Sequence, residues 1–134
     1  MNVFAINFML TALMSYMGTG AKFKVYGGIK PSAGGAETTL LAAAVLADPE
    51  GVVSGGMLVL AQADAAGDIA LATGVATWGR LETADGVWVE DFTVSGPSGS
   101  GQVKITAVDP APGDPEGQIY AGGTFLLGTV ILGA

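Results

Sequence analysis

The chain has 134 residues, a length that suits one domain and leaves little room for a second. Its net charge is −7, from 5 basic and 12 acidic side chains, and this balance argues against a nucleic-acid binder, which needs a basic patch to displace counterions from phosphates. The chain has no cysteine and no histidine, which excludes disulfides, Cys/His zinc sites and nucleophilic systems built on cysteine or histidine.

The surface expected from this composition is poor in charge. Half of the residues are hydrophobic and only 13% are charged, against about a quarter in an average soluble domain. The missing charge is either replaced by neutral polar groups or covered by another protein, and large exposed apolar patches usually mark interaction sites. We therefore expect an oligomer or a subunit of a larger assembly rather than a free monomer.

The first predicted element is a helix over residues 3–17, the most hydrophobic run of the chain. Asn2 is suited to cap its start, and Gly18 is suited to end it in a left-handed conformation. The run lacks the basic start of a signal peptide. It is also shorter than a membrane span and is interrupted by polar residues, so we expect no membrane insertion.

The polar residues of this helix form one narrow stripe, because Asn7, Thr11 and Ser15 are spaced by four. A helix that is apolar on most sides is buried on most sides, and a single sheet covers only one of them. The helix therefore either closes the open end of a β-sandwich or is shared with a neighbouring subunit. The residues expected at such a subunit contact are Phe4, Phe8, Leu10, Leu13 and Met14.

From Lys22 onward, short hydrophobic runs alternate with clusters of Gly, Pro, Asp and Ser, as is typical of strands. The pattern predicts a mainly β fold, an antiparallel β-sandwich or jelly-roll-like domain over residues 21–134, with residues 1–20 as a helical assembly or capping element. Residues 38–47 are rich in Ala and Leu and could instead form a helix. The expected strands cover residues 21–27, 38–46, 56–62, 69–72, 74–82, 87–95, 102–108 and 124–132.

The clearest local signal is a hairpin whose loop is Ala84-Asp85-Gly86, with glycine in the left-handed position. A two-residue Asp85-Gly86 loop is the alternative and would shift the register. With the three-residue loop, Thr83 faces Val87, and three further pairs follow on one face of the sheet. These pairs are Trp78 with Phe92, Arg80 with Glu90, and Glu82 with Trp88.

The tryptophans of this hairpin, Trp78 and Trp88, are predicted to be core or interface anchors, and a carbohydrate platform is the alternative. Arg80 is the only arginine of the chain, and we expect it to be a structural partner of Glu90.

Nothing in the sequence has the spacing of a catalytic or metal site. Glu82, Glu90 and Asp91 lie near one another in the predicted hairpin and could serve glycoside hydrolysis, but strand-face charges explain them better. The acidic loop at residues 109–117 offers oxygen ligands for Ca²⁺, yet it lacks EF-hand spacing and its prolines favour a stiff extended loop. We expect no enzymatic activity, no catalytic residues, no cofactor and no bound metal.

Three segments carry a resemblance to a known group of proteins. They are KFKVYGGIKP at 22–31, TGVATWGRL at 73–81 followed by Asp85-Gly86 and Val89, and IYAGGTF at 119–125. They resemble the opening strand and turn, the central hairpin and the final strand of small virion structural proteins of tailed bacteriophages. The resemblance covers most of the chain and lies in strand and turn motifs rather than in catalytic ones.

This resemblance implies a structural protein of the virion, assembled in the host cytoplasm. The first expectation is a capsid decoration (cement) protein that buries apolar side chains between capsid subunits. Its partner would be the major capsid protein or another virion protein, and we expect a homo-oligomer, with a trimer as the working guess. The alternative is a tail or fibre accessory module that binds carbohydrate on the host surface. Neither expectation involves nucleic acid or a membrane.

Overall fold

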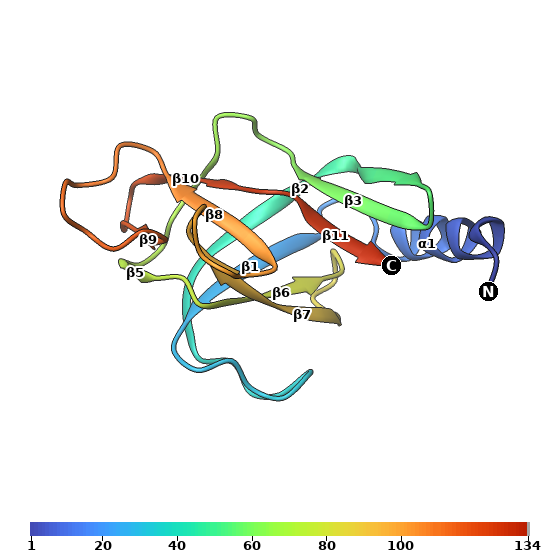
Figure 1. The fold of residues 1–134 in the computed structure, drawn as a ribbon, viewed down its shortest axis with the longest axis horizontal. Helices are drawn as coiled ribbons and strands as arrows, with labels where there is room; N and C mark the ends of the chain where they lie inside the picture. Colours follow the sequence, from blue (N-terminus) through green and yellow to red (C-terminus); the bar gives the residue numbers. More distant parts are fainter. Residues whose placement is uncertain (134) are drawn as a thin grey trace.

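The computed structural model describes residues 1–133, and Figure 1 shows one helix followed by a strongly curled sheet. Strands make up 45% of the chain and helix 11%, which confirms the mainly β class with an N-terminal helix. The elements in chain order are α1 (Val3–Met17), β1 (Lys22–Gly27), β2 (Thr39–Ser54), β3 (Met57–Gln62), β4 (Asp68–Ile69), β5 (Gly74–Val75), β6 (Trp78–Glu82), β7 (Trp88–Ser95), β8 (Val103–Ala107), β9 (Gln118–Ile119), β10 (Thr124–Leu127) and β11 (Val130–Gly133).

The main sheet has the strand order β11-β3-β2-β1-β6-β7-β8-β10-β4, and β5 pairs with β9 apart from it. In the described part of the chain β7–β8 is the one parallel pair; the others are antiparallel. The sheet curls until β10 approaches β3, where the Leu127 N–H donates to Gln62 Oε1 at 2.9 Å. A sandwich-like core fills the space inside, and its fully buried large side chains include Phe23, Leu58, Ile105 and Phe125.

The helix α1 begins and ends where the sequence predicts. Asn2 Oδ1 accepts a hydrogen bond from Ala5 N at 2.9 Å, which is the expected N-cap. Gly18 follows the helix with a positive φ of 77°, a conformation that favours glycine. Its ψ of 169° is extended, so Gly18 does not adopt the left-handed helical conformation that we expected. The chain instead leaves the helix in an extended conformation and continues toward β1.

The strand β2 is longer than predicted and is not a helix. It runs through Asp48 and Pro49, which we expected to lie beyond its end. Leu46 lies opposite Gln62 of β3, while Gly51 lies opposite Leu60, so residues 47–50 form a bulge without regular partners. Proline has no N–H to donate, and a bulge is where a strand tolerates it.

The loop between β6 and β7 confirms the three-residue prediction. The Thr83 N–H donates to Val87 O at 2.9 Å, and Gly86 has a φ of 86°. Glu82 lies opposite Trp88, as predicted.

Beyond this point the predicted register of the hairpin is wrong. The pairing shifts between Leu81 and Glu82, because β7 carries one extra residue there. As a result Arg80 lies opposite Asp91 rather than Glu90, and Trp78 lies opposite Thr93 rather than Phe92.

Candidate functional site

The helix α1 exposes several large apolar side chains to solvent. Phe4 is 80% exposed and Phe8 81%, and these two residues are one helical turn apart. No charged side chain occurs before Lys22. Burial of such a side chain is worth roughly 1.5–3 kcal/mol, so leaving several exposed is unusual in a protein of this size. We call this surface the outer face of α1; it consists of Met1, Phe4, Phe8, Met9, Ala12 and Tyr16.

The opposite face of the helix packs on the β-domain. Leu10 and Met17 are buried, and Ile6, Leu13 and Met14 are partly buried against the core. This face contacts β2, β3 and the edge strand β11, and Figure 1 shows the helix at the end of the molecule where both termini lie. The sheet therefore covers one side of α1, and the outer face stays open.

Hydrogen bonds fix the direction in which the outer face points. Asn7 Oδ1 accepts from Gly56 N at 2.8 Å in the turn between β2 and β3. At the other end of the helix, Met17 O accepts from Ala84 N at 2.8 Å in the β6–β7 loop. The helix is thus tied to two separate turns, and it presents its apolar surface in a defined orientation.

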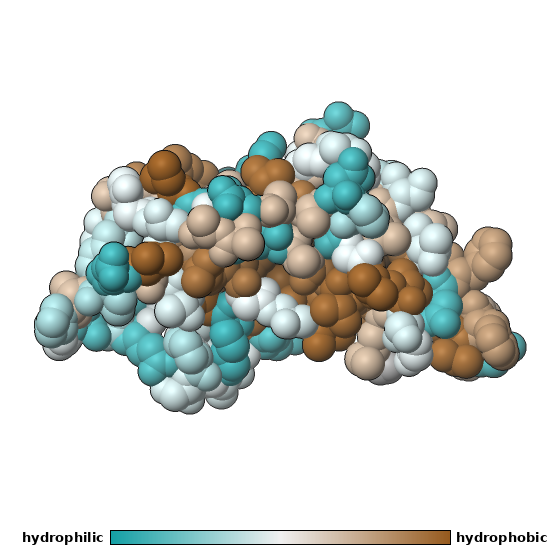
Figure 2. Space-filling view, turned by 90° about the horizontal axis from the view of Figure 1, so that it is seen from above, coloured by the Kyte–Doolittle hydropathy of each residue, from teal (hydrophilic) through white to brown (hydrophobic). Residues whose placement is uncertain are grey.

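A shallow groove of about 450 Å³ runs along the exposed side of the helix. In Figure 2, hydrophobic atoms cover much of the end of the molecule that holds α1. The polar stripe predicted from the sequence forms part of the wall of this groove, and the Thr11 hydroxyl donates to Asn7 O within the helix. The groove is lined by Phe4, Asn7, Phe8, Thr11, Ala12 and Ser15.

The predicted contact residues differ in how much surface they present. Phe4 and Phe8 are exposed, and Leu13 and Met14 are half-buried. Leu10 is 8% exposed and packs inward. The two tryptophans also differ in exposure: Trp78 has no exposed surface, whereas Trp88 is 42% exposed. Of these residues, Phe4, Phe8 and Trp88 therefore offer the most surface to a partner.

A second apolar surface lies at the corner of the sheet. Val52, Val59 and Ile131 stand side by side on β2, β3 and β11, with exposures of 69%, 37% and 46%. Since neighbouring residues of a strand point to opposite faces, Val59 points away from the side on which Leu58 and Leu60 are buried. This row is an apolar surface separate from the outer face of α1.

The one arginine belongs to a closed structural cluster. Arg80 binds Asp91 with two hydrogen bonds, Nε to Oδ1 at 2.7 Å and an Nη to Oδ2 at 3.1 Å. The Asp91 carboxylate also accepts from Gly34 N and from Trp88 Nε1. Burial raises the pKa of Asp91, but the hydrogen bonds from Arg80, Gly34 and Trp88 outweigh it and hold the pKa below its usual range. We call these groups the Asp91 cluster, and they fasten the loop between β1 and β2 to the sheet.

Trp78 lies beside this cluster, and its contacts within the chain account for its burial. Its ring stacks on Tyr26 with a centroid distance of 4.2 Å and an interplanar angle of 13°. The indole Nε1 donates to Thr38 Oγ1 at 2.8 Å, and the Arg80 guanidinium lies 5.1 Å from the ring centroid. These contacts are internal to the chain, so Trp78 acts as a core residue.

Two of the three carboxylates in the acidic loop at 109–117, those of Asp114 and Glu116, are hydrogen-bonded within the protein. Glu116 accepts from both the N–H and the hydroxyl of Ser98. Asp114 accepts from the Tyr120 hydroxyl at 2.6 Å. The loop is therefore braced by hydrogen bonds to side chains and backbone of neighbouring segments.

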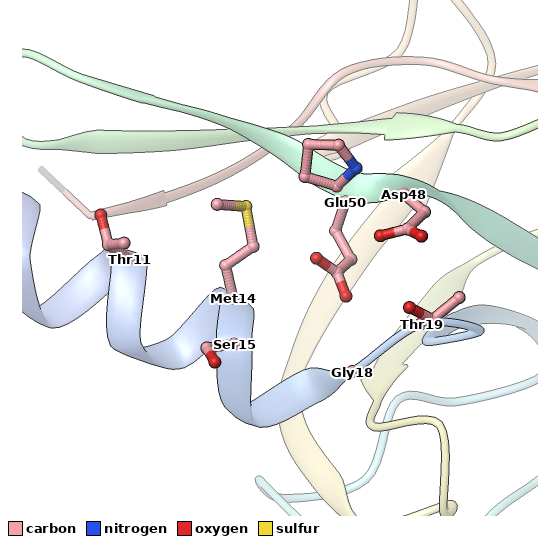
Figure 3. Close-up of a pocket in the computed structure, with 8 residues that line it drawn as sticks. Thr11, Met14, Ser15, Gly18, Thr19, Asp48 and Glu50 are labelled. Atoms are coloured by element: carbon pink, nitrogen blue, oxygen red, sulfur yellow. The ribbon is translucent and has the colours of Figure 1, made fainter.

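A pocket that the sequence did not indicate lies between the end of α1 and the bulge of β2. It has a volume of about 340 Å³, and Figure 3 shows the carboxylates of Asp48 and Glu50 directed into it from β2. Glu50 is only 4% exposed. Sequence reasoning missed both residues because an Asp-Pro pair is typical of a strand end or turn. The remaining lining residues are Thr11, Met14, Ser15, Gly18, Thr19 and Pro49.

Comparison with known proteins finds no matching family model, no matching curated protein and no matching solved structure. Within residues 1–133, no helix is both long enough and apolar enough to cross a membrane.

Proposed function

We propose that this protein is a structural subunit of a bacteriophage virion, a capsid decoration protein that joins a second copy of itself through the outer face of α1. The exposed, uncharged face of α1 is the observation that carries the proposal. The resemblance of three strand and turn segments to small phage virion proteins supplies the virion setting.

The size of the outer face supports a second copy as its occupant. An aromatic side chain buries about 150–250 Å², so Phe4, Phe8 and Tyr16 at their exposures of 80%, 81% and 64% offer on the order of 400 Å². Met1 and Met9 add more, which brings the face close to the ~800 Å² per partner of a standard interface. Such faces packed together around a symmetry axis would form interfaces of ordinary size.

Charge also favours self-association at this face. Two copies that each carry a net charge of −7 repel one another over most of their surfaces. The outer face of α1 is free of charged side chains, so this repulsion is weakest where the apolar groups meet. Closed symmetric oligomers are the common outcome for such contacts. We retain the trimer as the working stoichiometry, in which the outer faces of three copies meet around a threefold axis.

The proposed action on the capsid is mechanical. An oligomer that binds the assembled lattice and not its separate subunits stabilises the lattice by mass action. The apolar row of Val52, Val59 and Ile131 gives each copy a further surface for the capsid protein while α1 holds the neighbouring copy.

Disrupting the outer face is expected to abolish assembly without unfolding the protein. The double variant Phe4→Glu/Phe8→Glu should sediment as a monomer where the wild type sediments as a discrete oligomer. Both side chains are already exposed, so the free energy of unfolding of the monomer should change by less than about 0.5 kcal/mol. Sedimentation velocity over a range of concentrations, with urea unfolding, measures both quantities.

Ile29 provides the matched control. It is 88% exposed and lies after β1, outside α1. Ile29→Glu therefore replaces an exposed apolar side chain by one negative charge away from the outer face, and it should leave the oligomer intact. A wild-type protein that stays monomeric at the highest soluble concentration would refute the proposed interface. Co-sedimentation with heads of the phage that encodes the chain then tests the virion setting, and failure of the wild-type oligomer to pellet with heads would refute the decoration role alone.

A tail or fibre module that binds carbohydrate is the second candidate, and the exposure of Trp88 favours it. Trp88 is 42% exposed, and the face of an aromatic ring is suited to stacking on a sugar ring. The decoration role predicts no signal on a glycan array. Glycan binding that Trp88→Ala removes and that Phe4→Glu/Phe8→Glu retains would favour the tail module instead.

A further inference from the structure

Glu50 is a buried acid without a partner. Its side chain is 4% exposed, and among residues 1–133 it takes part in neither a hydrogen bond nor an ion pair. The other buried acids, Glu82 and Asp91, are paired with Lys24 and Arg80. The carboxylate of Glu50 opens onto the pocket at the end of α1, so a bound cation could reach it there.

The surroundings of Glu50 add negative potential and supply oxygen atoms. Figure 3 shows its carboxylate directed toward the last turn of α1, with Asp48 on the same strand and the Thr19 hydroxyl facing the same space. The carboxyl end of a helix carries the negative end of the helix dipole, and the last turn of α1 contains no basic residue. No basic side chain lines this pocket.

The bulge of β2 is what brings the two carboxylates to the helix. Regular pairing with β3 stops after Leu46 and resumes at Gly51, and the residues between them leave the ladder. Bulges redirect side chains, and this one places Asp48 and Glu50, two residues apart, at the same pocket. Pairing with β3 resumes at Gly51, where the two backbones lie very close together. A Cβ added to Gly51 would be 2.0 Å from Val59 O, so only glycine fits at the end of the bulge.

We propose that Asp48 and Glu50 bind a Ca²⁺ ion in this pocket, between β2 and the end of α1. Carboxylate, hydroxyl and carbonyl oxygens with flexible geometry are the ligands that Ca²⁺ accepts, whereas Mg²⁺ requires a stricter octahedron. No three acidic groups converge within residues 1–133, so water must complete the coordination shell. A site with two carboxylates belongs to the weak end of the Ca²⁺ range, with a Kd of about 10⁻⁴–10⁻³ M.

The ion would join two elements that otherwise meet only through side-chain packing at this end of the helix. Bound Ca²⁺ would hold the last turn of α1 against the bulge, and the folded state would gain stability in proportion to its occupancy. This site does not depend on the proposed function, because neither carboxylate belongs to the outer face of α1.

The test uses the full chain, stripped with a chelator and titrated with CaCl₂ by calorimetry and by thermal unfolding at constant ionic strength. One ion per chain should bind, and the unfolding temperature should rise by several degrees at millimolar Ca²⁺, with a smaller rise in equal MgCl₂. Glu50→Gln keeps the shape of the side chain and should weaken Ca²⁺ binding at least tenfold. The same variant should unfold at a higher temperature than the wild type in the absence of Ca²⁺, because it removes the unpaired charge.

Asp85→Asn is the control, since it removes an exposed carboxylate from the β6–β7 loop. It should bind Ca²⁺ as the wild type does. Equal weakening in Asp85→Asn and Glu50→Gln would show diffuse attraction to an acidic surface and would overturn the site. Absence of a 1:1 binding event in the wild type would also overturn it, as would a Glu50→Gln effect confined to self-association, which would assign the pocket to a basic side chain of a partner.

Discussion

Asp91→Ala is expected to lower the free energy of unfolding by about 3–5 kcal/mol, because it leaves the Arg80 guanidinium buried and unpaired. Arg80 is 5% exposed, and Asp91 is the acid that binds it. The substitution also removes the acceptor of Gly34 N and Trp88 Nε1, so the β1–β2 loop should loosen at the same time. Urea unfolding followed by circular dichroism measures the loss.

Glu90→Ala is the matched control for this prediction. Glu90 precedes Asp91 in β7 and is exposed. The sequence predicts it as the partner of Arg80, whereas the structure places Asp91 opposite Arg80. Its removal should change the free energy of unfolding by about 0.5 kcal/mol or less. If Glu90→Ala were the more damaging of the two, the register of the β6–β7 hairpin described above would be incorrect.

The pH dependence of Asp91 has a defined sign. Its pKa in the folded protein lies below the usual value, so the unfolded chain binds the proton more readily. The stability that Asp91 contributes is therefore fully present above the ordinary aspartate pKa of about 3.9 and is lost as the pH falls through the folded value. The difference between wild type and Asp91→Asn should shrink at acidic pH.

Trp78→Ala is expected to cost about 3–5 kcal/mol, the range found when a large aromatic core residue is truncated. The indole has no exposed surface, stacks on Tyr26 and donates to Thr38. Truncation leaves a cavity, removes the stacking partner of Tyr26 and removes the donor to Thr38 Oγ1, whose hydroxyl keeps its hydrogen bond to Gly27 O. Thermal and urea unfolding measure the effect.

Trp88→Ala serves as the comparison within the same hairpin. It removes one hydrogen bond to Asp91 and a partly exposed ring, so we expect a loss of about 1–2 kcal/mol. Equal losses for the two tryptophans would contradict the burial described for Trp78.

Features that depend on neighbouring residues were predictable from the sequence. The helix limits follow from Asn2 and Gly18, and the β6–β7 turn follows from Gly86. Strands were predicted near most of the observed strands, because alternation and turn residues are local signals. The mainly β class was predictable for the same reason.

Features that depend on packing between distant segments were not predictable. The extra residue in β7 has no local signature in the sequence. The predicted partner of Arg80, Glu90, was therefore one position away from the observed partner, Asp91. The continuation of β2 beyond Pro49 depends on β3, which resumes pairing at Gly51. The outer face of α1 was foreseen only in part, since the sequence showed an excess of apolar residues but not which ones the sheet would cover.

The position of the helix has a practical consequence for presenting foreign sequences on the protein. Figure 1 shows α1 and both chain ends at one pole of the molecule and the loop at residues 109–117 at the other. A tag fused to the N-terminus would crowd the outer face of α1, because Met1 belongs to that face. A peptide inserted at Gly113, where no neighbouring atom lies within 4 Å of an added Cβ, would project from the far pole and leave that face accessible.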